Sequence, residues 1–120
     1  MLENTARSRN ISLTQQWKES SPNFSWMHFN WLCRSYKSYK EKRYLIDYTD
    51  MLENFLKRKT TPTLKVLFID EAQDLSTLQW DCVKKLAENS EEVYIAGDDD
   101  QAIYKWAGAD VDQFISLKGN

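Results

Sequence analysis

An abrupt change from apolar to acidic residues at position 70 constrains this chain more than any other feature. Val66-Leu67-Phe68-Ile69 is a run of four apolar residues rich in strand-forming types, and Asp70-Glu71 follow it directly. A short apolar run bounded by polar residues predicts a buried strand of a parallel sheet. Ligands of open α/β sheets bind just beyond the carboxyl ends of such strands, so the two acids stand where chemistry is usually placed.

Two adjacent carboxylates at such a position can serve a hydrated Mg²⁺ and a water molecule, one as an oxygen ligand and the other as a base. The alternative is a strand that simply runs into a solvated acidic loop. Taken alone, the stretch is compatible with both interpretations.

The same pattern returns about thirty residues later. Val93-Tyr94-Ile95-Ala96 is again followed by a polar turn, Gly97-Asp98-Asp99-Asp100. Between the two runs, Ser76 and Gln79 form a capping-box pattern. The spacing predicts a right-handed βαβ unit whose two acidic turns lie side by side at one sheet edge. The intervening helix is expected to bury Leu78, Cys82, Val83 and Leu86.

Further helices are predicted on both sides of this unit. Asp47 is a natural N-cap for an amphipathic helix that ends near Lys59. A short helical piece is expected over residues 101–106, and Asp110 with Gln113 should cap a last helix. The polar segment 1–21 is expected to be poorly ordered or loosely docked through Trp17.

Residues 23–43 are predicted to be a helix with an aromatic and apolar stripe. Aromatic side chains interleaved with basic ones can bind single-stranded nucleic acid. The basic residues on the remaining faces are Lys37, Lys40, Lys42 and Arg43. A core stripe with a solvated basic face is the commoner explanation and the favoured one. The stripe consists of Phe29, Leu32, Tyr36 and Tyr39.

Composition bounds the function. The 120 residues are one domain or part of one, with 42% hydrophobic and 28% charged residues. No apolar stretch is long enough to span a membrane. Cys33 and Cys82 lack zinc spacing, and His28 is the only histidine, which disfavours a histidine metal site or a Ser-His triad. Residues 1–60 carry a net charge of +5 and residues 61–120 one of −7.

Two parallel strands cannot bury both faces of a sheet, so we expect the chain to be a piece of a larger protein.

The two acidic turns together resemble known motifs. Asp70-Glu71-Ala72-Gln73-Asp74 resembles motif II, the Walker B element, of superfamily 1 helicases, and residues 97–110 resemble motif III. The sequence Ile103-Tyr104-Lys105-Trp106 is similar to the version found in the UvrD/Rep/PcrA group of subgroup A, whose members are 3′→5′ DNA translocases. Residues 46–52 are similar to the segment by which that family returns from its 1B insertion into its 1A domain.

This resemblance implies a fold and a division of the chain. The expected class is α/β: part of a P-loop NTPase (RecA-like) 1A domain with a parallel βαβ unit, preceded by helices of the 1B insertion. Residues 1–45 would belong to the 1B insertion and residues 46–120 to the 1A domain with motifs II and III.

The resemblance also implies the roles of the acidic turns. Asp70 would help to hold Mg²⁺ on the nucleotide phosphates, and Glu71 would be the base that orients the attacking water. Gln101 would contact the γ-phosphate or this water and report the nucleotide state. Asp74 and Asp98 are expected to support the site from the same two turns.

Tyr104 and Trp106 would face DNA, Trp106 by stacking on a base, and a single helical turn would couple them to Gln101. The chain departs from the family at two positions. Ala107 stands where many members have an arginine that pairs with the motif II acids, so this coupling is absent or supplied elsewhere. Lys105 stands where arginine is common.

The implied function is a fragment of an ATP-dependent 3′→5′ DNA helicase, with ATP and Mg²⁺ as cofactors. Expected partners are single-stranded DNA, ATP and the remaining helicase domains, namely the Walker A half and domains 2A and 2B. The protein would be cytoplasmic, bacterial or phage-encoded, with no membrane partner. The fragment should be inactive alone because it has no Gly-Lys-Thr/Ser loop. The alternatives are a non-catalytic piece of a split or decayed helicase that binds single-stranded DNA or a partner, and, more weakly, another P-loop NTPase.

Overall fold

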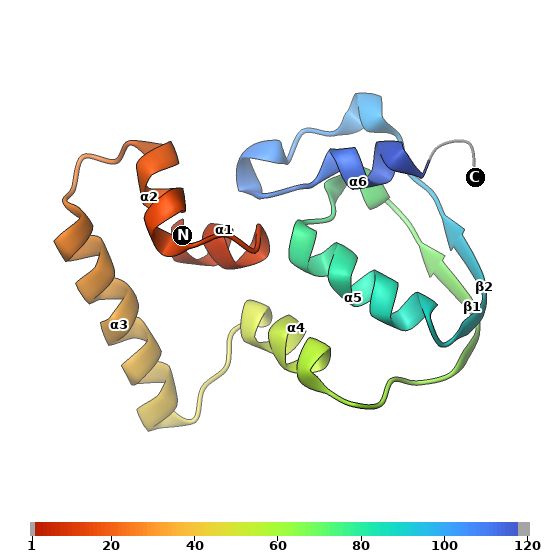
Figure 1. Ribbon diagram of the computed structural model, residues 1–120, viewed down its shortest axis with the longest axis horizontal. Coiled ribbons are helices and arrows are strands. Elements are labelled where there is room, and N and C mark those ends of the chain that lie inside the picture. Colours follow the sequence, from red (N-terminus) through yellow and green to blue (C-terminus); the bar gives the residue numbers. More distant parts are fainter. Residues whose placement is uncertain (1, 118–120) are drawn as a thin grey trace.

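The computed structural model describes residues 2–117, which form an α/β unit and a group of helices beside it (Figure 1). Residues 118–120, the end of the predicted 1A segment, lie outside this range. The elements in chain order are α1 (Leu2–Ser8), α2 (Leu13–Ser20), α3 (Trp26–Arg43), α4 (Tyr48–Lys57), β1 (Leu64–Ile69), the 3₁₀ turn η1 (Ala72–Asp74), α5 (Thr77–Ala87), β2 (Ser90–Ile95), the 3₁₀ turns η2 (Asp99–Gln101) and η3 (Lys105–Ala107), and α6 (Val111–Ser116).

The predicted βαβ unit is confirmed. Strands β1 and β2 pair in parallel, with Leu67 opposite Val93 and Phe68 opposite Tyr94, and α5 connects them. Helices α5 and α6 lie on the same side of this sheet (Figure 1). Their apolar side chains meet the sheet in a small core, so the class of the fold is α/β as expected. The buried members of this core are Ala72, Trp80, Val83 and Phe114.

Side-chain caps explain where two of the helices begin. The Ser76 hydroxyl accepts from the Gln79 amide at 3.3 Å, and the Gln79 side chain accepts from the Ser76 amide at 2.9 Å. Asp47 and Asp50 exchange the same pair of bonds at the start of α4. Both capping boxes satisfy backbone donors that the first helical turn leaves unpaired. The N-caps predicted at Ser76 and Asp47 are therefore confirmed.

The second face of the sheet is open within the described chain. Phe68 is 74% exposed and stacks on Tyr94, their ring centroids lying 5.0 Å apart. The apolar run 66–69 was predicted to be a fully buried strand, and this is only half correct. Leu67 packs into the core, whereas Val66 and Phe68 face outward because no described element covers them.

The N-terminal segment differs from the expectation. Residues 1–21 were expected to be poorly ordered or loosely docked through Trp17, but residues 2–8 and 13–20 form α1 and α2. Ser12 caps α2 through the Gln15 amide, and Ala6 is fully buried.

Trp17 docks α2 as expected: its indole donates to the Phe24 carbonyl at 3.1 Å and packs edge-on against Trp26. A second anchor, Arg7, was not predicted. Its guanidinium bonds to acidic side chains of α4, and such distant contacts leave no local sequence signal.

Helix α3 forms as predicted, but its stripe is not a core stripe in this chain. Phe29 is 5% exposed, whereas Leu32 is 59% and Tyr39 is 50% exposed. The molecule measures 46 × 34 × 16 Å, and α3 stands at the edge away from the sheet (Figure 1). Only the end of the stripe near α2 is therefore covered by described residues.

The C-terminal elements are less regular than predicted. The piece expected over residues 101–106 is not one helix: η2 ends at Gln101, the chain is extended at Ala102, and η3 begins at Lys105. Asp110 precedes α6 but makes no side-chain cap to the helix backbone. Its carboxylate accepts instead from Thr77 and from the Gln113 side chain, which ties α6 to the start of α5.

Candidate functional site

The two acidic turns lie side by side at the carboxyl edge of the sheet, as predicted. The Ala96 amide donates to the Ile69 carbonyl at 2.8 Å, and the Ala72 amide donates to the Ala96 carbonyl at 3.0 Å. These bonds continue the parallel pairing one step beyond the strands. They place the residues that follow β1 directly beside those that follow β2.

Asp70 and Glu71 are both exposed at this edge. One carboxylate oxygen of Asp70 accepts from the Glu71 amide at 2.9 Å. Glu71 has a φ of 52°, in the left-handed region that a non-glycine residue rarely adopts. Strain of this kind costs on the order of 1–3 kcal/mol and is found where a surrounding structure holds a side chain in place for function.

Gln73 joins the two turns, and sequence reasoning missed it. Its side chain is 1% exposed. The amide nitrogen donates to Glu71 Oε2 at 2.6 Å, and the amide oxygen accepts from the Asp98 backbone at 3.0 Å. Its position inside the acidic stretch was visible in the sequence, but its partner lies 25 residues away.

Asp98 holds Gln101 in the second turn. The Gln101 side-chain nitrogen donates to Asp98 Oδ2 at 2.8 Å, and the Asp100 amide donates to Asp98 Oδ1 at 3.1 Å. Gln101 is exposed. The structure therefore brings Glu71, Gln73, Asp98 and Gln101 into one hydrogen-bonded path along the sheet edge.

Asp74 lies on the buried side of this edge. Its Oδ1 is buried without a hydrogen-bond partner among the described residues. Its backbone amide donates to the Glu71 carbonyl at 3.0 Å, which closes η1. A buried carboxylate oxygen without a donor is costly, so this atom marks a place where a further polar group would be favourable.

The donor chemistry of this edge fits a magnesium ion bound together with phosphates. Mg²⁺ in such sites takes one or two carboxylates and fills its other positions with water and phosphate oxygens. Asp70 offers an exposed carboxylate at the strand end, and Glu71 stands beside it. Within residues 2–117 there is no cluster of three or more acidic, histidine or cysteine side chains that could hold a metal on its own.

Tyr104 lies just before η3 and Trp106 lies within it, and neither belongs to this path. Trp106 is 75% exposed and Tyr104 is 46% exposed. Trp106 lines an open groove of about 930 Å³ between η3 and the N-terminal helices. Other residues that line the groove are Arg9, Ile11, Gln16, Lys105 and Gly108. An exposed indole beside a groove is available for stacking.

The segment that follows η3 is fixed to α5. The buried indole of Trp80 donates to the Asp110 carbonyl at 3.2 Å, and the Asp110 amide donates to the Leu75 carbonyl at 2.7 Å. Ser76 and Ala109 form an isolated antiparallel bridge. These bonds hold the groove side of η3 against the α/β core.

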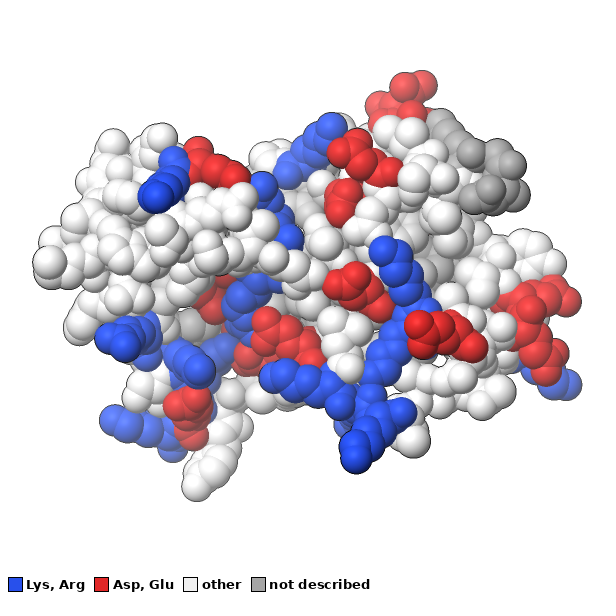
Figure 2. Space-filling view, viewed as in Figure 1, with Lys and Arg blue, Asp and Glu red and all other residues white. Residues whose placement is uncertain are grey.

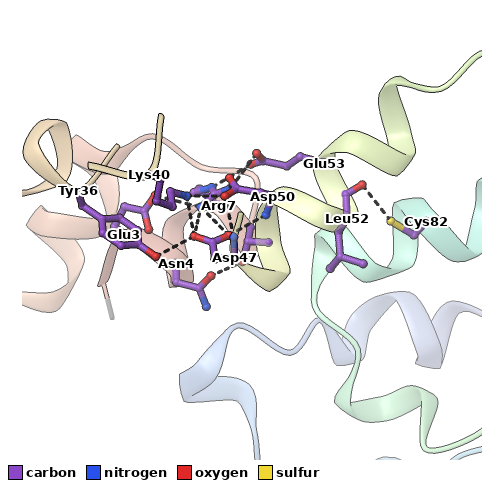
Figure 3. Close-up of polar contacts among 11 residues, drawn as sticks. Glu3, Asn4, Arg7, Tyr36, Lys40, Asp47, Asp50, Leu52, Glu53 and Cys82 are labelled. Carbon is purple, nitrogen blue, oxygen red and sulfur yellow. Dashed lines mark hydrogen bonds and ion pairs between the residues drawn. The ribbon is translucent and has the colours of Figure 1, made fainter. Parts of the chain in front are cut away.

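An ionic cluster joins α1, α3 and α4 (Figure 3). Arg7 binds Glu53 through two nitrogens at 2.9 and 3.1 Å and also contacts Asp47 and Asp50. Lys40, 8% exposed, donates to Asp47 at 2.7 Å and Asp50 at 2.6 Å. Lys40 was assigned to a solvated face from the sequence, and this is wrong because the start of α4 folds over it.

Charge is distributed unevenly over the surface. Figure 2 shows basic side chains over the region where α3 and α4 end, and acidic ones toward the sheet. Some of the basic residues have structural roles: Lys85 donates to the Leu56 carbonyl at 2.6 Å and also bonds to the Arg58 carbonyl, which satisfies the open end of α4. None of the helices in the described part of the chain is long and apolar enough to cross a membrane.

The fold and the edge define an α/β protein with a polar edge at the carboxyl ends of two parallel strands. The family model described as UvrD/REP helicase N-terminal domain matches residues 1–120, and the chain belongs to this family. It is 33% identical over 92 residues to "ATP-dependent DNA helicase Rep" of Buchnera aphidicola subsp. Baizongia pistaciae, covering 69% of this chain and 14% of that protein.

Two further relatives have similar names. "ATP-dependent DNA helicase PcrA" of Bacillus subtilis is 35% identical over 74 residues, which cover 62% of this chain and 10% of that protein. "ATP-dependent DNA helicase srs2" of Schizosaccharomyces pombe is 35% identical over 85 residues, which cover 67% of this chain and 10% of that protein. The chain thus spans about a seventh or less of the length of each of these three relatives.

Proposed function

We propose that this chain is part of an ATP-dependent 3′→5′ DNA helicase, with the turn after β1 serving as motif II and residues 97–110 as motif III. In this proposal residues 46–120 belong to a RecA-like 1A domain of the P-loop NTPase fold, and residues 1–45 to its 1B insertion. The names of the relatives and the family membership support it.

The observation that carries the proposal is the hydrogen-bonded path across the sheet edge. Glu71 and Gln101 are thirty positions apart, yet the path through Gln73 and Asp98 connects their side chains. A hydrolase of nucleoside triphosphates needs a carboxylate for the attacking water and a polar group that contacts the phosphate, placed together. These two residue types meet here at the edge where α/β proteins bind ligands.

Each residue of the edge has a role in this reaction. Asp70 would hold Mg²⁺, which when bound neutralises charge on the phosphates. Glu71 accepts the proton of the attacking water on the oxygen that Gln73 leaves open. Gln101 both donates and accepts, so it can orient the water or contact the γ-phosphate. Asp98 holds Gln101 in place, and Asp74 supports the turn from its buried side.

Single-stranded DNA is the proposed partner of the groove beside η3. Trp106 stacks on a base, and Tyr104 lies at the start of the same turn. Lys105 offers positive charge along the groove, whereas Arg9, which also lines it, is paired with Glu19 at 2.6 Å. The further partners are ATP and the remaining helicase domains: the half with the phosphate loop and domains 2A and 2B.

The test is ATP turnover, with and without single-stranded DNA, in the full-length protein that contains this chain. The Glu71→Gln variant is expected to lose turnover by on the order of 10²–10⁴-fold while it still binds nucleotide. Glu91→Gln, at an exposed glutamate on β2, is the matched control and should keep the wild-type rate. Turnover that persists in Glu71→Gln would refute the proposal.

Binding to DNA is tested separately in the same protein. Trp106→Ala should weaken binding to single strands roughly 5- to 100-fold, since one base stack contributes about 1–3 kcal/mol. Tyr44→Ala removes an aromatic ring that is 96% exposed at the end of α3, outside the groove, and should leave binding unchanged. Equal affinities of the wild type and Trp106→Ala would contradict the role of the groove.

A non-catalytic DNA-binding or partner-binding piece is the second candidate. It is favoured by one observation: the chain has an exposed aromatic groove but contains no Gly-Lys-Thr/Ser loop. In that case single strands would bind in a salt-dependent and Trp106-dependent way, and no ATP turnover would accompany binding.

A further inference from the structure

Gln73 is the most enclosed polar side chain at the sheet edge. It is 1% exposed, and Trp80 and Gln73 are the largest side chains that are fully buried among the described residues. Both ends of its amide are used: Nε2 donates to Glu71 Oε2 at 2.6 Å and Oε1 accepts from the Asp98 amide at 3.0 Å. One buried side chain therefore contacts both acidic turns.

These two bonds need a side chain that donates at one end and accepts at the other, as an amide does. The carboxylate of Glu71 requires a donor, and the backbone N–H of Asp98 requires an acceptor. An apolar side chain would satisfy neither, and a carboxylate would satisfy only Asp98. The orientation of the Gln73 amide is fixed by the same logic, because the flipped amide would place donor against donor and acceptor against acceptor.

The turn after β2 is shaped around this amide. A Cβ atom on Gly97 would lie 2.5 Å from Gln73 Oε1, 3.0 Å from Phe114 Cζ and 3.1 Å from the Ala72 nitrogen. These distances are too short for a side chain at position 97. The backbone of the second turn can therefore approach Gln73 only because residue 97 is glycine.

The contact reaches the exposed residues of both turns. Glu71 stands in the left-handed region, and its Oε2 is held by Gln73, which leaves Oε1 facing outward. On the other side the Asp98 carboxylate holds the Gln101 side chain at 2.8 Å. A change at Gln73 would thus release the side chain of Glu71 and the backbone that carries Asp98 at the same time.

We propose that Gln73 is a positioning residue that sets the place of the Glu71 carboxylate relative to Gln101 for ATP hydrolysis. This inference rests on the proposed function. Gln73 itself lies beneath the edge and acts through the Glu71 carboxylate and the Asp98 backbone. Its effect is to fix the base and the polar contact residue in one geometry before ligands bind, which reduces the reorganisation needed for reaction.

The experiment compares Gln73→Leu and Gln73→Glu in the full-length protein. Gln73→Leu loses both bonds, and we expect kcat for ATP to fall roughly 10- to 100-fold, as for other residues that orient a reacting group. We expect the affinity for Mg-nucleotide to change less than about threefold, because no nucleotide contact is removed. A fall in affinity with kcat unchanged would overturn the proposal.

Gln73→Glu keeps the acceptor for Asp98 but sets two carboxylates against each other. Like charges this close repel, so the Glu71 carboxylate is displaced although the Asp98 amide keeps its acceptor. We therefore expect kcat of Gln73→Glu to fall at least as far as that of Gln73→Leu, with the affinity for Mg-nucleotide again changed less than about threefold. A wild-type kcat in folded Gln73→Glu would overturn the proposal.

A readout without nucleotide completes the test. Hydrogen exchange of the Asp98 amide should accelerate in Gln73→Leu and stay slow in Gln73→Glu, because only the latter retains an acceptor. Near-ultraviolet circular dichroism of the buried Trp80 verifies that each variant is folded. Gln15→Glu is the matched control: Gln15 likewise donates to a glutamate, Glu19 at 2.9 Å, but on exposed α2, so its rate should equal the wild type.

The outcomes separate this inference from the proposed function. If Glu71→Gln abolishes turnover and folded Gln73→Leu retains it, only the role of Gln73 is refuted. If Glu71→Gln retains turnover, the proposed function is refuted and the role of Gln73 with it.

Discussion

The guanidinium of Arg7 donates a hydrogen bond at 3.1 Å to the carboxylate of Asp47, 40 residues further along the chain. The same group binds Asp50 and Glu53, so one arginine of α1 contacts three acids of α4 and its N-cap (Figure 3). The cation is mostly buried, with 15% of its side-chain surface exposed. The contact fixes the N-terminal helix pair to the rest of the molecule.

Replacing Arg7 should therefore destabilise the fold. Arg7→Met leaves Lys40 as the remaining cation of the cluster. We expect the free energy of unfolding to fall by about 2 kcal/mol, which is less than for the loss of one partner of a fully buried ion pair. The measurement is denaturant-induced unfolding. Arg9→Met is the control, since its pair with Glu19 is more exposed and should contribute under about 1 kcal/mol. Equal losses in the two variants would contradict the structural role of Arg7.

The same cluster predicts how stability depends on pH. Partial burial opposes the charged form of Asp47, but hydrogen bonds from Lys40 and the Asp50 amide outweigh it, so the pKa of this carboxyl lies below its usual range. The pKa of Asp50 is lowered in the same way. As pH falls, these two carboxylates are therefore protonated first in the unfolded chain, where the pKa of aspartate is about 3.9. This stabilisation is present above that pH and is lost as pH falls from about 5 through the folded pKa.

Unfolding midpoints measured between pH 7 and pH 2 check this expectation. The Asp47→Asn variant should show a flatter decline on the acid side, because it lacks one group whose pKa changes on folding. Asp112→Asn, at an exposed position in α6, is the control and should follow the wild-type curve. The pKa of Lys40 is raised after its ion pairs overcome burial, so its contribution is lost only as pH rises above about 10.4 and does not affect the acid side.

Local patterns in the sequence predicted the α/β unit well. The apolar runs around Leu67 and Val93 and the capping box at Ser76 depend on neighbours in the chain, and all three correspond to the elements observed. Asp70 directly follows β1, and Asp98 comes two residues after Ala96, the residue that follows β2, in the next turn. The parallel edge then places the two turns side by side without further information.

The features that the sequence did not predict depend on contacts between distant residues. Helices α1 and α2 are short and polar. Arg7 holds α1 to α4, and Trp17 packs α2 against the first residue of α3, neither through an apolar stripe. Lys40 was expected to be one of several solvated lysines, but the start of α4 covers it and pairs with it. Gln73 has no local signal of its role, because its partner Asp98 belongs to the other turn.

The spacing of Gln101 and Tyr104 misled for a different reason. Three positions apart, they fit one helical turn, but the backbone is extended at Ala102. Bonds from Trp80 and Leu75 to Asp110 fix the following segment from outside. Tertiary contacts thus override the local helical preference, and any coupling between the two residues passes through two 3₁₀ turns.

Trp80 should be a major determinant of stability in this region. Its indole is 1% exposed and donates to the Asp110 carbonyl. Trp80→Phe leaves this carbonyl without its donor and creates a small cavity, and we expect a loss of about 1–3 kcal/mol in unfolding experiments. Trp31→Phe, at a tryptophan that is 67% exposed, is the control and should change stability by less than about 0.5 kcal/mol.

The 120-residue chain alone should not hydrolyse ATP. It lacks the Gly-Lys-Thr/Ser loop whose backbone amides and lysine hold the phosphates in enzymes of the proposed kind. The measurement is phosphate release by the purified chain with Mg²⁺ and single-stranded DNA. Turnover by the wild-type chain that disappears in Glu71→Gln would contradict this prediction and would show that the edge is sufficient for catalysis.

The close approach of Gly97 to Gln73 predicts a non-additive pair of substitutions. Gly97→Ala places a methyl group 2.5 Å from the Gln73 oxygen, which forces the buried amide to move, and we expect a loss of about 1–3 kcal/mol. In a Gln73→Ala background this oxygen is absent, so the added cost of Gly97→Ala should shrink by at least about 0.5 kcal/mol. Denaturant unfolding of the four variants measures the difference.

Gly108→Ala is the matched control. Its φ of 103° makes alanine costly, but the neighbours of Gly108 are Arg9 and Ser8, so the cost of Gly108→Ala should be equal in both backgrounds. Equal costs of Gly97→Ala in both backgrounds would show that the Gln73 amide does not restrict position 97.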